Sequence, residues 1–195
     1  MTSSGGPDVS LSTMLRTELL QLARQSLSLA VHGKKLPKVD LTTCPPEFVA
    51  EGACFVTLTI QRNLRGCIGA LEAYQPLVLD VIEHAAAAGV NDYRFSPVSP
   101  RELSTIRIEI SRLTKPQILP YTDGQDLLGK LRPGTDGVII RDGRQRATFL
   151  PQVWEQITDA AEFLDHLCYK MGARSDLWRR KKLEVSIYQV EEFHE

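Results

Sequence analysis

The stretch Ala53-Cys54-Phe55-Val56-Thr57-Leu58-Thr59-Ile60-Gln61-Arg62 decides the fold class of this chain. It is rich in β-branched and aromatic residues. Side chains of an extended segment alternate between two faces, so one face here carries Cys54, Val56, Leu58 and Ile60. Residues 105–113 alternate in the same way, with Ile106, Ile108 and Ile110 on one face. Both stretches predict strands, the second of them half-buried.

Apolar residues recur at helical spacing on both sides of these strands. Helices are predicted over residues 12–32, 75–90, 123–131, 151–158 and 159–171, and further strands over 67–71, 137–141, 145–149 and 183–190. A turn is expected at residues 63–66, and a hairpin turn at Asp142-Gly143-Arg144. Strands and helices are mixed without a regular βαβ order. This favours an α+β fold with a largely antiparallel sheet and flanking helices.

The composition is that of an ordinary globular protein. Of 195 residues, 43% are hydrophobic and 24% are charged, and the net charge of −1 gives no strong attraction to nucleic acid or anionic membranes. Residues 1–10 are predicted to be a disordered tail, and residues 11–195 a single domain. The chain begins without a secretory signal, and no window reaches the roughly 18 apolar residues of a membrane span. We therefore expect a cytoplasmic protein with reduced thiols.

The segment Arg65-Gly66-Cys67-Ile68-Gly69 is the most informative for function. In an extended segment, Arg65 and Cys67 project from the same face with their Cα atoms roughly 6.5 Å apart. A guanidinium that close would favour a reactive thiolate, and the two glycines would let a ligand or another backbone approach. The alternative is a buried structural cysteine, which we expect for Cys54 and Cys168.

The same segment resembles a known protein family. Asn63-Leu64-Arg65-Gly66-Cys67-Ile68-Gly69 is similar to a motif of the AMMECR family, also known as protein A of the AmmeMemoRadiSam system. Further similar stretches follow in the family's order at residues 91–98, 108–111, 134–138, 148–154 and 163–172, with Trp178. Tyr93 stands where the family pattern has proline. The resemblance spans about residue 15 to the C-terminus.

The resemblance implies an α+β fold of two unequal lobes, with the cysteine segment near a cleft that they share. It also implies association with a Memo-type protein and a radical SAM protein. It supplies no reaction, because the family has no established activity. The residues themselves predict no cofactor, because glycine-rich phosphate loops are absent, and no metal, because neither a C-x-x-C pair nor a histidine cluster is present.

Other polar residues are weighed beside Cys67. Asn91, Asp92 and Arg94 lie in an irregular stretch and either line a pocket or, for Asp92 and Arg94, form a structural ion pair. His84 is expected to be a solvated helical residue rather than a general base for Cys67. The acidic residues Glu191, Glu192 and Glu195 are expected to form a solvated chain end.

Three functions remain open from the sequence. The first is a cysteine-dependent enzyme or enzyme subunit acting on a small anionic or nucleotide-like substrate. In it, Cys67 is the nucleophile and Arg65 stabilises the thiolate or binds the anion. Backbone amides near Gly66 and Gly69 would stabilise an oxyanion, and Asp92 and Arg94 would complete the pocket. The second is a ligand- or partner-binding module. The third is an RNA-associated factor that uses the basic residues 179–182.

Overall fold

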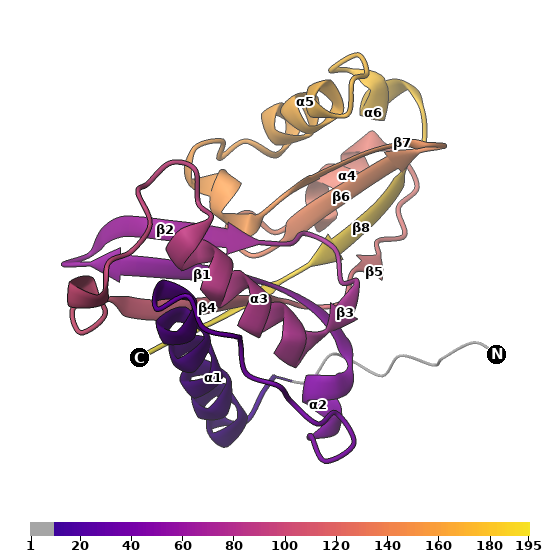
Figure 1. Cartoon of the computed structure of the whole chain (residues 1–195). Coiled ribbons are helices and arrows are strands. Elements are labelled where there is room, and N and C mark those ends of the chain that lie inside the picture. Colours follow the sequence, from indigo (N-terminus) through magenta and orange to yellow (C-terminus); the bar gives the residue numbers. More distant parts are fainter. Residues whose placement is uncertain (1–9) are drawn as a thin grey trace. The chain divides into compact units, whose positions relative to one another are not determined.

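The chain forms two compact units in the computed structural model, which describes residues 10–195. Unit 1 runs to Leu113 and also contains Glu191–Glu195, and unit 2 comprises Thr114–Val190. Figure 1 shows that each unit combines a sheet with helices. Nine positions of the expected N-terminal tail, residues 1–9, lie outside the described residues. Among residues 10–195, no helix has the length and apolar character needed to cross a membrane.

Unit 1 contains a five-stranded sheet in the order β2-β1-β4-β9, with β3 also paired to β1. The strands are β1 (Glu51–Ile60), β2 (Asn63–Gly69), β3 (Gln75–Pro76), β4 (Arg107–Leu113) and β9 (Val190–His194). The helices are α1 (Thr13–Val31), α2 (Pro46–Val49), α3 (Leu77–Val90) and the 3-10 helix η1 (Pro100–Glu102). The β1–β2, β1–β3 and β1–β4 pairs are antiparallel.

One face of the unit 1 sheet forms the core with α1 and α3 (Figure 1). The alternation predicted for residues 53–62 explains this, because Cys54, Val56 and Leu58 are fully buried in that core. On α1, the residues at helical spacing that meet them include Leu19 and Leu27, also fully buried. Burying apolar surface on one side leaves the other face of β1 and β2 free to carry polar side chains.

The turn between β1 and β2 differs from the prediction. It lies at Gln61-Arg62, where both residues have positive φ, and not at residues 63–66. Two consecutive positive φ angles make the two-residue hairpin turn whose twist fits the flanking strands. Glycine and asparagine usually fill such positions, so the glutamine and arginine here gave no turn signal.

Unit 2 contains a four-stranded sheet in the order β5-β8-β6-β7, in which the pairs are antiparallel. Its elements are β5 (Gln117–Ile118), α4 (Gly124–Lys130), β6 (Gly137–Asp142), β7 (Gln145–Phe149), η2 (Pro151–Glu155), α5 (Ala160–Lys170), α6 (Leu177–Arg180) and β8 (Glu184–Tyr188). The predicted hairpin turn at Asp142-Gly143-Arg144 is confirmed. The core of the unit is centred on Trp154 and Phe163, whose rings stack.

The α+β class with antiparallel sheets and flanking helices is confirmed. Several elements differ from the expectations. The strand expected over residues 67–71 covers Asn63–Gly69, and the helix expected from residue 75 begins at Leu77, after β3. Within the helix expected over residues 151–158, only Pro151–Glu155 are helical, as a short 3-10 helix, and the strand expected over residues 183–190 ends at Tyr188, after which β9 joins the other sheet. The acidic end is not solvated as expected. Glu191 forms ion pairs with Arg16 and Arg112, and Glu195 forms one with Arg24.

Candidate functional site

The Cys67 side chain lies on β2, opposite Thr57 of β1. The Thr57 hydroxyl donates a hydrogen bond to Cys67 Sγ at 3.3 Å. Cys67 is partly exposed, whereas Cys54 and Cys168 are buried, as the sequence predicted for those two. A hydroxyl that donates to sulfur stabilises the thiolate more than the thiol. The residue is therefore partly exposed and has a hydrogen-bond donor at its sulfur.

The main chain of Cys67 is held by Asp92 and Arg94, which lie in the loop after α3. Asp92 Oδ2 accepts the Cys67 N–H at 2.8 Å, and Arg94 Nη2 donates to the Cys67 carbonyl at 3.0 Å. The two side chains also pair with each other, at 2.9 Å from Nε to Oδ1 and 2.7 Å from Nη2 to Oδ2. The sequence left a structural ion pair and a pocket lining open, and the ion pair is present.

Asp92 and Arg94 each stabilise the charged form of the other. The Arg94 guanidinium, bonded to Asp92, holds the pKa of that carboxyl well below its ordinary value despite burial, and the Cys67 amide acts in the same direction. The hydrogen bond from Arg94 to Asp92 likewise raises the pKa of the guanidinium. Asp92 is 5% exposed, so its charge depends on these partners. The loop therefore fixes the direction of the Cys67 backbone.

The Arg65 guanidinium is bound to Glu102 and Ser96. Its Nε lies 2.7 Å from Glu102 Oε1, and its Nη1 donates to the Ser96 carbonyl at 2.9 Å. The Arg65 bond is the main cause that lowers the pKa of Glu102 to about 2. A register shift between Leu58 and Thr59 puts a bulge in the ladder at Arg65, which interrupts the regular alternation we assumed. A role for Arg65 beside the Cys67 thiolate stays a prediction.

The two glycines of the segment have backbone neighbours. A Cβ at Gly66 would lie 2.2 Å from the Ala88 carbonyl oxygen of α3, and one at Gly69 would lie 2.4 Å from the Cys54 carbonyl oxygen. Of the two reasons considered for these glycines, a ligand or another backbone, the structure supplies the second. Gly66 thus lets α3 lie against β2 next to Cys67.

The remaining predicted residues have local structural positions. Ile68 packs against the core of unit 1. Asn91 is exposed and ends α3, with its N–H bonded to the Ala87 carbonyl. The group gathered at Cys67 therefore consists of Cys67, Asp92 and Arg94 from the prediction, together with Thr57 as the sulfur donor. Thr57 was not identified from the sequence, although a hairpin register would have placed it opposite Cys67.

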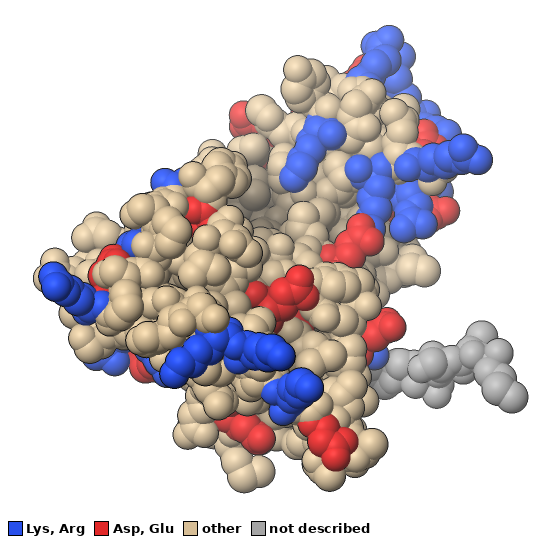
Figure 2. Space-filling view, in the orientation of Figure 1, with Lys and Arg blue, Asp and Glu red and all other residues tan. Residues whose placement is uncertain are grey.

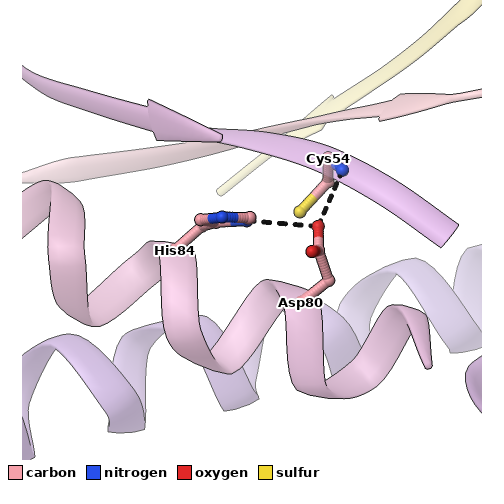
Figure 3. A group of neighbouring side chains, drawn as sticks. All are labelled: Cys54, Asp80 and His84. Carbon is pink, nitrogen blue, oxygen red and sulfur yellow. Dashed lines mark hydrogen bonds and ion pairs between the residues drawn. The ribbon is translucent and has the colours of Figure 1, made fainter. Parts of the chain in front are cut away.

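The expectation for His84 is wrong, because this residue is buried, at 6% exposure. Its Nδ1 lies 3.1 Å from Asp80 Oδ2, which also accepts the Cys54 N–H at 2.8 Å. Figure 3 shows the three side chains facing one another, with Cys54 on β1 and the other two on α3. Burial, followed by the charge of Asp80, raises the pKa of the Cys54 thiol well above its ordinary value.

This cluster was not predicted from the sequence, although a signal was present. Asp80 and His84 are four residues apart and so lie on one face of a helix. That face also carries Leu77 and Val81, which marks it as the buried one. A polar pair on a buried helix face needs a partner across the core. The alternating strand at residues 53–62 was the available source of one.

The basic run expected for RNA binding is largely neutralised. Arg179, Arg180 and Lys181 form ion pairs with Asp165, Asp176 and Asp142, in that order. Lys182 lies over the Tyr121 ring. On the face drawn in Figure 2, basic side chains gather over the α6 and β7 end of unit 2, with acidic ones among them. Such pairing reduces the positive potential that phosphates would meet.

Relatives of this chain come from several archaea. A protein of Thermofilum pendens is 36% identical over 91% of this chain and 88% of its own length, and one of Methanothermobacter thermautotrophicus is 38% identical over 91% and 92%. The crystal structure of an uncharacterised protein from Pyrococcus horikoshii superimposes with a TM-score of 0.75 at 31% identity, covering 95% of this chain and 93% of that one. The model of the AMMECR1 family matches residues 20–193. The resemblance inferred from the cysteine segment is therefore confirmed, and the chain belongs to the AMMECR1 family.

Proposed function

We propose that this protein is a cysteine-dependent enzyme, or the cysteine-bearing subunit of one, that acts on a small anionic or nucleotide-like substrate. Cys67 is the nucleophile. One observation carries the proposal: the sulfur of a partly exposed cysteine accepts a hydroxyl hydrogen bond while both backbone groups of the same residue are held by an ion pair. Free cysteines are usually buried and act as small hydrophobic residues, which is not the setting of Cys67.

The substrate class follows from the guanidinium groups beside Cys67. The Arg94 side chain is 44% exposed, although its Nη2 is bonded to Cys67 and Asp92. Guanidinium groups recognise carboxylates and phosphates through paired N–H donors. Asp92 and Glu102 balance the charges of Arg94 and Arg65, so recognition rests on directed hydrogen bonds and not on a net positive field. The cleft that would hold the substrate is part of the proposal.

The geometry also refines the predicted roles. The Cys67 N–H is bonded to Asp92, so it does not serve as an oxyanion donor in this arrangement. In the proposed mechanism, the Thr57 hydroxyl stabilises the thiolate before attack. The Arg94 guanidinium then binds the anionic group of the substrate. Asp92 is a positioning residue, because it acts through the Cys67 amide and through Arg94.

Alkylation kinetics of Cys67 test this proposal in the full chain. Rates with iodoacetate and iodoacetamide are measured for each cysteine by peptide mass spectrometry at constant pH. We expect Cys67 to react about ten times faster than buried Cys54 and Cys168, in line with thiolate character and exposure. We also expect a higher ratio of iodoacetate to iodoacetamide rates at Cys67 than at partly exposed Cys44, because the Arg94 guanidinium donates hydrogen bonds to the carboxylate of the anionic reagent.

Two variants on β1 test the hydrogen bond from the Thr57 hydroxyl to the Cys67 sulfur. Thr57→Val removes the hydroxyl bonded to sulfur, and Thr59→Val makes the same change two residues along β1. A hydrogen bond to a charged group is worth about 1.5–3 kcal/mol, and the rise in intrinsic nucleophilicity recovers about half of the lost rate on a logarithmic scale. We expect Cys67 to react about 3–10 times more slowly in Thr57→Val and normally in Thr59→Val. Equal rates in all three proteins would refute an activated thiol.

A second function, a ligand- or partner-binding module, is favoured by a different observation. Gly66 and Gly69 accommodate this chain's own backbone, and Arg65 is bound to Glu102 and Ser96, so the segment also fits a binding surface in which Cys67 is present because a small side chain fits. Memo-type and radical SAM proteins, which the resemblance implies as partners, stay predictions and are the first to test by titration calorimetry. In this case Cys67→Ser leaves binding unchanged, whereas Arg65→Ala weakens it.

A further inference from the structure

A second group of chemically active side chains lies on the opposite face of β1. Cys54 projects toward α3, whereas Thr57, three residues along the strand, contacts Cys67. The Cys54 sulfur, an Asp80 carboxylate oxygen and a His84 ring nitrogen all lie within 4.8 Å of one another, and all three residues are buried. The sequence-based function assigns nothing to this cluster. Figure 3 shows that the three side chains converge on one point.

We propose that Cys54, Asp80 and His84 form a zinc-binding site in the core of unit 1. Thiolate sulfur, imidazole nitrogen and carboxylate oxygen are the three ligand types that Zn²⁺ takes in proteins. With metal–ligand distances of about 2.0–2.3 Å, tetrahedral ligands lie roughly 3.3–3.7 Å from each other. The distance of 3.1 Å from His84 Nδ1 to Asp80 Oδ2 is already close to that spacing, and the Cys54 sulfur lies within 4.8 Å of the other two ligand atoms.

Rigid elements position the three ligands. Asp80 and His84 are four residues apart on α3 and share a face of that helix, and Cys54 comes from the paired strand β1. The Cys54 N–H also bonds to Asp80 Oδ2, which fixes the carboxylate against the strand that carries the sulfur. Supporting hydrogen bonds of this kind orient metal ligands before the metal arrives.

The charges of the cluster fit a divalent cation. A Cys54 thiolate and an Asp80 carboxylate carry two negative charges, which Zn²⁺ balances, and a neutral His84 completes the set. Isolated charges are costly in an apolar interior, so a neutral ligand–metal group is the form that the core tolerates. Three protein ligands leave one tetrahedral position open. That number is typical of zinc sites that also bind water or a substrate.

A polar path connects the cluster with the surface. Gln75 Nε2 lies 3.4 Å from Asp80 Oδ1, 2.7 Å from Glu83 Oε2 and 2.9 Å from the Tyr74 hydroxyl. Tyr74 and Glu83 are exposed. Gln75 thus lies between the buried carboxylate and solvent, and rotation of its side chain would open a route for the ion. This route approaches from the start of α3, away from the loop that holds Cys67.

Cobalt substitution tests the site in the full-length protein. The chain is stripped with a chelator, titrated with Co²⁺ and then with Zn²⁺. We expect one Co²⁺ per chain, a sulfur-to-cobalt charge-transfer band and visible bands of tetrahedral intensity, all removed by one equivalent of Zn²⁺. X-ray absorption of the zinc form should show one sulfur ligand. No charge-transfer band in the wild-type chain, or a metal without a sulfur ligand, would overturn the proposal.

Matched variants locate the ligands. Cys54→Ala and His84→Asn should weaken zinc binding by at least about 100-fold, since even supporting residues cost 10–100-fold. Cys168→Ala removes the other buried cysteine and His32→Asn an exposed histidine, and both should bind as the wild type does. Cys67→Ser should also retain the metal, which separates this proposal from the one for Cys67. Should a ligand variant fail to fold, the wild-type cobalt spectrum and sulfur count still decide. Equal zinc affinity in Cys54→Ala and wild type would refute the site.

Discussion

Cys54 and Cys67 lie on adjacent strands of one sheet and are anchored in the same way. In each, the main-chain N–H donates to an aspartate oxygen at 2.8 Å, from Cys54 to Asp80 and from Cys67 to Asp92. The partners of the two carboxylates differ. Asp80 contacts the imidazole of His84 inside the core, whereas Asp92 pairs with the guanidinium of Arg94 at the surface.

This difference explains why the two thiols suit different chemistry. Arginine keeps its proton under all ordinary conditions, so Asp92 and Arg94 form a lasting ion pair that holds the backbone of Cys67 and makes no bond to its sulfur. Histidine exchanges its proton easily and binds metals through the same nitrogen atoms. The buried pair can therefore release its hydrogen bond to an ion, and the exposed pair cannot.

The largest expected effect comes from Gly66, where β2 packs against α3, the helix next to both cysteine sites. Gly66→Ala puts a methyl group 2.2 Å from the Ala88 carbonyl oxygen, so β2 and α3 must separate. We expect the free energy of unfolding to fall by about 3 kcal/mol, the upper part of the range for overpacking. Urea denaturation measures the loss. Alkylation of both Cys54 and Cys67 should accelerate, because both depend on α3 and the loop after it.

A glycine on α4 provides the control. A Cβ at Gly129 would meet nothing within 4 Å. Gly129→Ala should therefore leave the free energy of unfolding unchanged or raise it by up to about 1 kcal/mol, since alanine is the better helix former. An equal loss in both variants would show that the close approach at Gly66 is not what stabilises the sheet.

A smaller loss of stability is expected when either aspartate that accepts a cysteine N–H is replaced. Asp92→Ala removes the partner of Arg94 and of the Cys67 amide, and Asp80→Ala does the same for His84 and the Cys54 amide. Removing one partner of a buried hydrogen bond costs about 1–3 kcal/mol, and the exposure of Arg94 lets water replace Asp92 in part. We expect a loss of about 2 kcal/mol for Asp92→Ala.

The alkylation rates of Cys54 and Cys67 in these two variants show whether Asp80 and Asp92 act independently. Asp92→Ala should change the alkylation rate of Cys67 and leave that of Cys54 within about twofold, since the two carboxylates share no hydrogen-bond partner. Asp80→Ala should do the reverse. Peptide mass spectrometry reads both rates from one sample. A variant that changes both thiols equally would mean that the sheet responds as a whole.

The smallest effect concerns Arg65. Its bond to Glu102, together with the hydrogen bonds from Ser99, lowers the pKa of that carboxyl from 4.5 to about 2, so these contacts stabilise the fold above about pH 5 and are lost as the pH falls toward 2. Glu102→Gln should lower the melting temperature at pH 7 by about 2–4 °C, for a pair worth about 1 kcal/mol. The difference from wild type should shrink steadily between pH 5 and pH 2.

The matched control for Glu102→Gln is the same substitution at an exposed carboxylate on α5. Glu162 is exposed and lies 3.8 Å from His166, so Glu162→Gln should change the free energy of unfolding by less than about 0.5 kcal/mol. A gap between wild type and Glu102→Gln that stays constant from pH 7 to pH 2 would contradict the ion pair as its source.

Local patterns predicted much of the fold. The alternation of Ile106, Ile108 and Ile110 gave a strand whose three isoleucines are buried, and Asp123 begins α4 as expected, with its side chain accepting from two backbone amides. The turn at Gln61-Arg62 was missed because neither residue is typical of positive φ. β9 was missed because the charges of Glu191 and Glu192 resemble a solvated end. Arg16 and Arg112, which pair with Glu191, are distant in sequence.

The site was predictable only where its residues are adjacent. Cys67 was recognised from its glycine neighbours and the family motif, and Arg94 and Asp92 from the irregular loop. Their contacts with Cys67 span 25 and 27 residues, so no spacing rule predicts them. The bond from Arg65 to Glu102 spans 37 residues. Alternation alone placed Arg65 beside Cys67, and the bulge at Arg65 changes that geometry.

The loop that holds Cys67 has a further consequence, because β2 is an edge strand of its sheet. An open edge offers N–H and C=O groups to any extended peptide, and the exposed Leu64 adds apolar surface on the same strand. Asp92 and Arg94 occupy the N–H and C=O of Cys67, as a neighbouring strand would. Two side chains thus protect the sheet against strand addition and aggregation at this position. Loss of Asp92 would free the edge of β2 to pair with another strand, and it would also leave the Cys67 main chain without its support.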